Sequence, residues 1–104
     1  MEAQPVIQIR GIILHQCEGR SSPRFLCQYC GEIIDRAGDA FLVWNPKEGE
    51  ALCVHRGCYR EHGDPCHWAL DIGTLLVYLL WNTGIEGQQA LAKWEEIAKA
   101  LAHV

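Results

Sequence analysis

With 104 residues, 49% of them hydrophobic and 21% charged, the chain has the length and composition of one globular domain rather than of a disordered segment. Its formal net charge of −4 at pH 7 argues against nonspecific binding to nucleic acid, which depends on clustered Lys and Arg. The longest apolar run, residues 75–81, is far shorter than the roughly 18 residues that a membrane-spanning helix requires, so we expect no membrane span. Residues 1–5 do not resemble the start of a secretory signal, and we expect a cytoplasmic protein.

The first expected element is a strand at residues 6–15 (VIQIRGIILH), where β-branched residues predominate and apolar and polar residues alternate at first. Gly11 interrupts this run and predicts a bulge or a break. Residues 17–24 (CEGRSSPR) contain Gly, Ser and Pro, a composition that predicts a loop.

A cysteine pair and a hairpin are expected next. Residues 25–31 (FLCQYCG) end on Gly31, at a point where a tight turn often needs positive φ. Residues 40–44 (AFLVW) and 51–54 (ALCV) are short strand-like runs around NPKEGE, which predicts a hairpin with a longer turn. Residues 55–62 (HRGCYREH) then predict about two helical turns that stop at Gly-Asp-Pro.

The last third of the chain is expected to be helical. Residues 68–82 (WALDIGTLLVYLLWN) are apolar almost all round from Leu75, which predicts a buried helix with a C-cap near Gly84, and a strand is the alternative. Residues 86–103 repeat apolar side chains at spacings of three and four, which is typical of an amphipathic helix. The expected fold is therefore α+β: a single domain, 1–104, with an N-terminal strand and loop (1–24), a metal-stabilised hairpin and helix (25–64) and two C-terminal helices (65–104).

Four residues predict a zinc site: Cys27 and Cys30 at one end of the hairpin, and His55 and Cys58 at the other. A C-x2-C turn directs two sulfurs toward one point, and H-x2-C at the start of a helix does the same one turn apart. Three thiolates and one imidazole suit tetrahedral Zn²⁺.

The motifs Cys27-Gln28-Tyr29-Cys30-Gly31 and Val54-His55-Arg56-Gly57-Cys58-Tyr59 resemble those of treble-clef zinc fingers, over about a third of the chain. The ligand order is similar to that of the first finger of LIM domains and of the poly(ADP-ribose) polymerase finger. The resemblance implies two ligands from a knuckle and two from the first turn of a helix. A LIM domain would have another Cys pair just after Cys58, and the polymerase finger is basic, so we carry over the fold and the metal only.

Other ligand sets stay open at this point. Cys53 lies two residues before His55, on the same side of a strand, and could replace it as a ligand. A second metal could use Cys17, His62, Cys66 or His67, although Gly-Asp-Pro interrupts the helix between His62 and Cys66.

The sequence favours a structural zinc module over an enzyme, because four protein ligands leave the metal no open position and no catalytic motif is evident. The surplus of large apolar residues after residue 67 predicts a protein partner or a homodimer formed through the C-terminal helices. The alternative is a nucleic-acid-binding finger that uses four arginines in or near the zinc segment, namely Arg20, Arg24, Arg56 and Arg60.

Overall fold

The structure of the chain, a computed structural model, describes residues 6–64 and 67–102. Over these ranges the chain contains both strands and helices, which confirms the predicted α+β class. The chain divides into two compact units that meet between Gly73 and Thr74, and each is described by itself. The prediction of a single domain with three parts stays a prediction.

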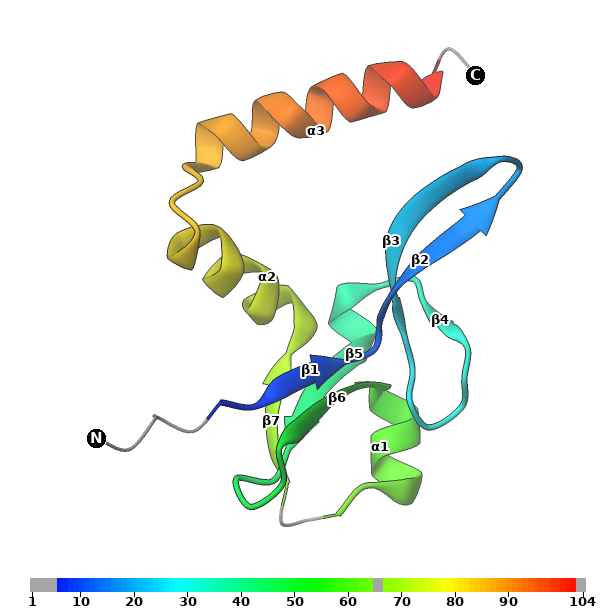
Figure 1. Cartoon of the computed structure of the whole chain (residues 1–104), viewed down its shortest axis with the longest axis vertical. Helices are drawn as coiled ribbons and strands as arrows, with labels where there is room; N and C mark the ends of the chain where they lie inside the picture. Colours follow the sequence, from blue (N-terminus) through cyan, green and yellow to red (C-terminus); the bar gives the residue numbers. More distant parts are fainter. Residues whose placement is uncertain (1–5, 65–66, 103–104) are drawn as a thin grey trace. The chain divides into compact units, whose positions relative to one another are not determined.

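The larger sheet of the first unit has four strands in the order β1-β6-β5-β7 (Figure 1). These are β1 (Gln8–Arg10), β5 (Ala40–Trp44), β6 (Glu50–His55) and β7 (Trp68–Asp71). β1 runs parallel to β6, whereas β5 is antiparallel to both β6 and β7. The predicted hairpin is thus confirmed as β5 and β6, and it forms the centre of the sheet.

A second, three-stranded sheet consists of β2 (Ile12–Cys17), β3 (Arg20–Leu26) and β4 (Ile33–Ile34), in that order. The expectation of a loop at residues 17–24 is therefore wrong. Glu18 and Gly19 both have positive φ, 54° and 76°, so the chain reverses in a two-residue turn whose twist suits a hairpin.

Pro23 is compatible with β3 because of where it lies in the sheet. It is paired with Leu14 of β2 on one side, and β4 contacts only Phe25 and Leu26 on the other. The missing backbone N–H of Pro23 therefore costs no hydrogen bond to β4, which explains how a Ser- and Pro-containing segment can be a strand.

Gly11 marks the break that the sequence predicts, since it separates β1 in one sheet from β2 in the other. Its φ is 123°, and a Cβ added there would lie 2.7 Å from Cys53 Cβ and 2.9 Å from the carbonyl oxygen of Leu26. Only glycine allows the backbone to cross so close to β6.

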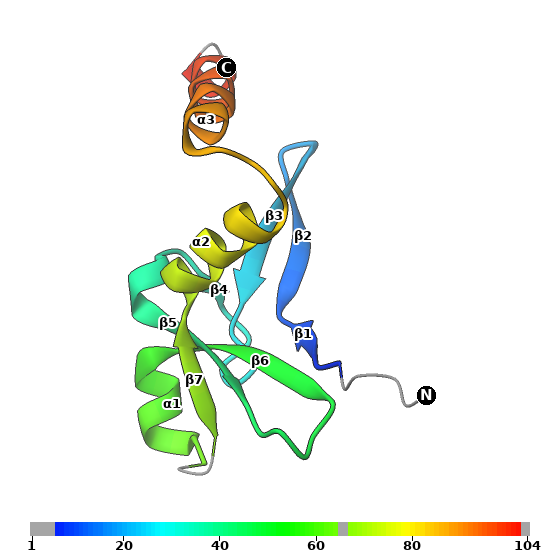
Figure 2. The ribbon, with the colours of Figure 1, turned by 90° about the vertical axis from the view of Figure 1, so that its left-hand side faces the viewer.

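α1 (Arg56–His62) packs against one face of the larger sheet (Figure 2). On the α1 side, Phe41 meets the ring of Tyr59 edge to face, with 6.0 Å between centroids. On the opposite face, Gly11 lies directly against the side chain of Cys53. Because both sides are covered, neighbouring residues Cys53 and Val54 of β6 are both fully buried.

The second unit contains most of α2 (Ile72–Asn82) and all of α3 (Gly87–Ala102). The predicted helix at 68–82 is wrong in its first four residues, which form β7, the alternative that the sequence left open for this segment. The amphipathic helix at 86–103 is confirmed as α3 for its described part, since His103 lies outside the described residues.

α2 is also not the buried helix that its composition predicts. Ile72 and Leu75 are buried, but Val77, Tyr78 and Trp81 are exposed. None of the helices in the described ranges combines the length and the apolar character needed to cross a membrane.

Candidate metal centre

The first half of the site is the cysteine turn, residues 27–31, which follows β3. Cys27 is fully buried, and its backbone is fixed by two hydrogen bonds: its N–H donates to Glu32 at 2.9 Å, and its carbonyl accepts from Gly31 at 2.9 Å. Gly31 has φ of 76°, the left-handed conformation that the sequence predicts for it. This closed turn brings Cys30 back beside Cys27.

The second half comes from the junction of β6 and α1. His55 is the last residue of β6 and the N-cap of α1, with extended backbone angles. Cys58 follows in the first turn of α1, so the two side chains lie on adjacent positions of one helix end. α1 has only seven residues, too few to be stable alone, and depends on such tertiary contacts.

The structure brings the four side chains together. The ligand atoms of Cys27, Cys30, His55 and Cys58 all lie within 4.8 Å of one another, so the cluster could hold a metal ion. His55 Nδ1 lies 3.3 Å from Cys30 Sγ and 4.0 Å from Cys58 Sγ. Tetrahedral zinc with Zn–S of about 2.3 Å and Zn–N of about 2.0 Å would separate ligand atoms by about 3.5 to 3.8 Å. The cluster is therefore close to the size that zinc requires.

The surroundings of Cys27 favour the thiolate form of its side chain. Burial disfavours its charged form, but the backbone N–H of His55 donates to its sulfur at 3.3 Å. Further hydrogen bonds from the backbones of Cys30 and Tyr29 act in the same direction, and together they lower the pKa of Cys27 from 9.0 to about 6. A thiolate is the form that binds metal.

The surroundings of Cys58 instead favour the protonated form of its thiol. Desolvation raises its pKa, and the neighbouring sulfurs of Cys27 and Cys30 raise it further, to about 12. Several thiolates this close repel one another unless a cation lies between them. A divalent ion among these sulfurs would relieve the repulsion that helps to raise the pKa of Cys58.

Cys53 is not part of this cluster. It is fully buried in β6, and burial followed by the charge of Cys27 raises the pKa of its thiol to about 11. A neutral, buried thiol behaves as a small apolar side chain.

No second cluster occurs within residues 6–64 and 67–102, where the four residues above form the only group of three or more potential ligands, so the alternative of a second metal gains no support there. Cys17 is exposed at the end of β2. Cys66 lies outside the described residues, so the alternative in which it binds a second metal with His62 or His67 is not tested.

A polar hollow of about 210 Å³ lies beside His55, lined also by Ile33, Asp35, Arg36 and Asp39. The amino-acid sequence does not predict this hollow, because β4 and the short 3-10 turn at Ala37–Asp39 (η1) that build it are local features without a periodic pattern. The only sequence signal is the mixture of charged residues between the two ligand pairs.

Two of the four arginines of the nucleic-acid alternative are engaged within the first unit. Arg24 forms an ion pair with Asp35 at 3.3 Å. Arg56 lies 4.7 Å above the ring of Phe41, donates to the carbonyl of Gly38 at 3.0 Å and is 3.8 Å from Asp71. Arg20 lies at the turn end of β3, a separate position from the helix that carries Arg60.

Comparisons with family models, with curated proteins and with solved structures find no match to this chain.

Proposed function

We propose that this protein is a structural zinc-binding module of the treble-clef type, non-catalytic, which acts by binding protein through its C-terminal helices. The observation that carries the proposal is the convergence of four ligand atoms from three separate segments, the cysteine turn, the end of β6 and the first turn of α1. α1 contains no buried residue, so its packing alone contributes little to holding Cys58 in that arrangement.

The structural role follows from the ligand set. Three thiolates and one imidazole fill a tetrahedral coordination sphere, so a zinc ion there would have no open position for water or substrate. Its contribution would be to stability: structural zinc sites contribute on the order of 10 kcal/mol, comparable to the whole folding free energy of a small domain. The order of turn, hairpin and helix supports the treble-clef assignment.

The nucleic-acid alternative has less support. The ion pairs of Arg24 and Arg56 direct two of its four cations toward carboxylates of the same chain. A nucleic-acid surface would present such groups free toward phosphates. The cytoplasmic location stays a prediction from the sequence.

Metal analysis of the purified full-length chain tests the proposal. We expect one zinc per chain, and we expect a chelator to abolish the cooperative thermal transition of the first unit, because the energy lost is comparable to its total stability. The Cys58→Ser variant should lose the zinc. Cys17→Ser, the same change at an exposed cysteine, is the matched control and should retain it.

Titration with Co²⁺ supplies a second readout, since its absorption spectrum reports thiolate ligands directly. A chain that binds no metal, or a Cys58→Ser variant with unchanged zinc content and spectrum, would contradict the proposal.

A further inference from the structure

α3 presents an apolar stripe that nothing else in the described part of the second unit covers. Leu91, Trp94 and Ile97 lie on one face of the helix, and all three are exposed, Trp94 by 65%. The charged residues lie toward the other side of the helix: Lys93, Glu95, Glu96 and Lys99. A helix of 16 residues is marginal in water without packing, so this stripe needs a partner.

Hydrogen bonds fix the conformation of the turn between α2 and α3. The N–H of Ile85 donates to Leu80 at 3.2 Å and that of Gly84 to Trp81 at 3.5 Å, the paired bonds of a Schellman C-cap, with φ of 74° at Gly84. The backbone N–H of Glu86 then donates to the side chain of Gln89 at 3.2 Å, as in a capping box. The two helices therefore leave the turn in fixed directions.

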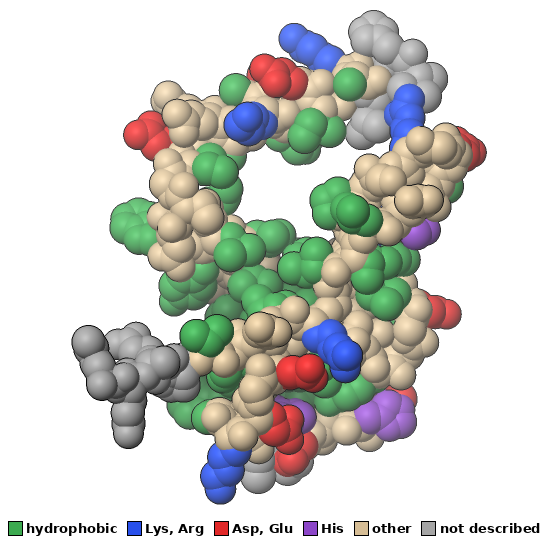
Figure 3. Space-filling model, viewed as in Figure 1, with side chains coloured by type: hydrophobic (Ala, Val, Ile, Leu, Met, Phe, Trp, Pro, Cys, Tyr) green, Lys and Arg blue, Asp and Glu red, His purple; other side chains and the backbone are tan. Residues whose placement is uncertain are grey.

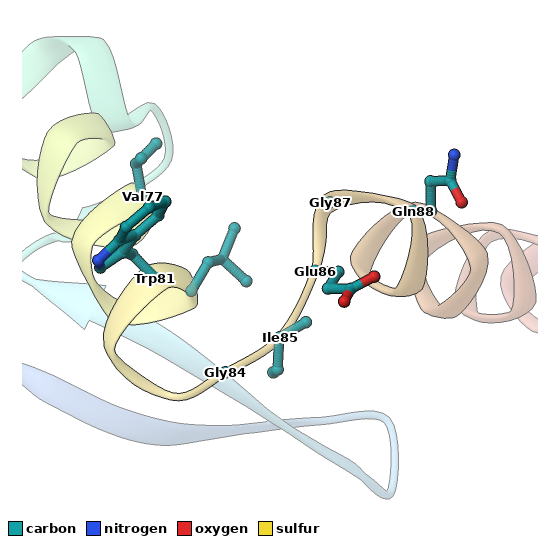
Figure 4. Close-up of a pocket in the computed structure, with 8 residues that line it drawn as sticks. Val77, Trp81, Gly84, Ile85, Glu86, Gly87 and Gln88 are labelled. Carbon is teal, nitrogen blue, oxygen red and sulfur yellow. The ribbon is translucent and has the colours of Figure 1, made fainter.

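An apolar hollow of about 680 Å³ lies at this turn, and α2 and α3 diverge from it with little packing against each other in the described chain (Figure 1, Figure 4). Val77, Leu80 and Trp81 line it from α2, and Ile85 lines it from the turn. Trp81 is 83% exposed. The hollow is thus an open, preformed groove with an aromatic wall.

The exposed apolar surface is large for so small a unit (Figure 3). The exposed side chains of the stripe and of the groove, namely Val77, Trp81, Ile85, Leu91, Trp94 and Ile97, together amount to on the order of 700 Å² of apolar area. A monomer seldom leaves more than a few hundred Å² in one patch, whereas a stable interface buries about 800 Å² on each partner.

We propose that the occupant of this surface is a second copy of the chain, so that the protein is a homodimer in which α3 of each copy packs into the groove between α2 and α3 of the other. This inference rests on the proposed function in one respect, the assignment of binding to the C-terminal helices, and it names their partner. The area fits a dimer, and each copy offers both the stripe and the groove, so a two-fold arrangement covers both at once. Two lysines and three glutamates give this unit a formal charge of −1, too little to keep two copies apart.

Light scattering of the eluted full-length protein at micromolar concentration tests the inference, with zinc content measured on the same samples. We expect twice the mass of one 11.7 kDa chain. Trp94→Gln and Trp81→Gln, which remove a ring from the stripe and from the groove, should each raise the dimer dissociation constant by about 30-fold. Lys99→Gln places the same side chain on the charged face of α3 and should leave the dimer unchanged.

A monomeric mass in the wild-type protein would overturn the inference, whether the stripe then packs on its own chain or binds a different protein. A dimer that resists both tryptophan changes would overturn it too. Zinc content keeps the two proposals apart: one zinc per chain in a monomeric protein refutes the dimer alone, and a metal-free dimer refutes the zinc module alone.

Discussion

Replacing Gly11 by alanine should destabilise the first unit severely, although the change adds only one methyl group. The added Cβ would lie 2.7 Å from Cys53 Cβ and 2.9 Å from the carbonyl oxygen of Leu26, closer than such atoms approach. Overpacking of this kind costs about 1 to 3 kcal/mol. The φ of 123° adds a strain of about 1 to 3 kcal/mol for a residue with a side chain, so we expect a total loss of about 2 to 6 kcal/mol.

Two other glycines separate these contributions. Gly19 has φ of 76° but nothing within 4 Å of an added Cβ, so Gly19→Ala measures backbone strain alone and should cost about 1 kcal/mol. Gly38 has neither positive φ nor a close neighbour, and Gly38→Ala should change stability by less than about 0.5 kcal/mol.

Urea unfolding of the three variants in the presence of excess zinc gives the free energies to compare. Zinc affinity should fall in Gly11→Ala as well, because Leu26 immediately precedes Cys27 and its N–H donates to Gly11 at 2.7 Å. If Gly11→Ala lost no more stability than Gly19→Ala, the close crossing of β1 and β2 past Cys53 would be refuted.

Three further predictions concern the turn between α2 and α3, the contact of Arg56 with Phe41, and the pH dependence of zinc affinity. Gly84→Ala should cost about 1 kcal/mol in a thermal melt because residue 84 has φ of 74°, whereas Gly87→Ala at the start of α3 should stabilise the protein by about 0.5 to 1 kcal/mol. Arg56→Lys should cost about 0.5 to 1 kcal/mol in urea unfolding through its weaker contact with Phe41, and Arg60→Lys should be neutral. Zinc affinity, measured by competition with a chromophoric chelator, should fall about tenfold or more for each pH unit between pH 8 and 6. The Cys58 thiol, with a pKa raised to about 12, must give up its proton to bind.

The ligand cluster and α3 could be predicted from the sequence because both depend on local spacing. H-x2-C at the beginning of a helix places two side chains one turn apart whatever the rest of the fold does. The apolar period of α3 likewise needs only the helix itself.

β3 and β7 could not be predicted because their conformation depends on the strands that pair with them. Residues 17–24 have a loop composition, and they become a strand only because β2 lies beside them. Trp68 and its neighbours continue an apolar run that suits a helix, but the open edge of β5 supplies hydrogen bonds, and Trp68 pairs there with Trp44. Tertiary hydrogen bonding therefore outweighs local preference at both places.

The prediction that His55, and not Cys53, is the fourth ligand most directly tests the geometry of the candidate metal centre. In β6, Cys53 and His55 point to the same side of the strand, and the sequence alone leaves either as the ligand. In the structure, only His55 has its ligand atom within 4.8 Å of the other three, whereas Cys53 is a fully buried thiol that lies against Gly11.

Cys53→Ala should therefore keep one zinc per chain and lose about 1 to 2 kcal/mol in urea unfolding, the cost of a small cavity. His55→Ala should lose the zinc, whereas His55→Cys should retain it, because four thiolates also make a closed zinc site. Metal content after dialysis against a weak chelator distinguishes these outcomes. A Cys53→Ala protein without zinc, beside a His55→Ala protein that holds it, would place the fourth ligand two residues earlier on β6 and would require the cysteine turn to face the middle of the strand instead of its end.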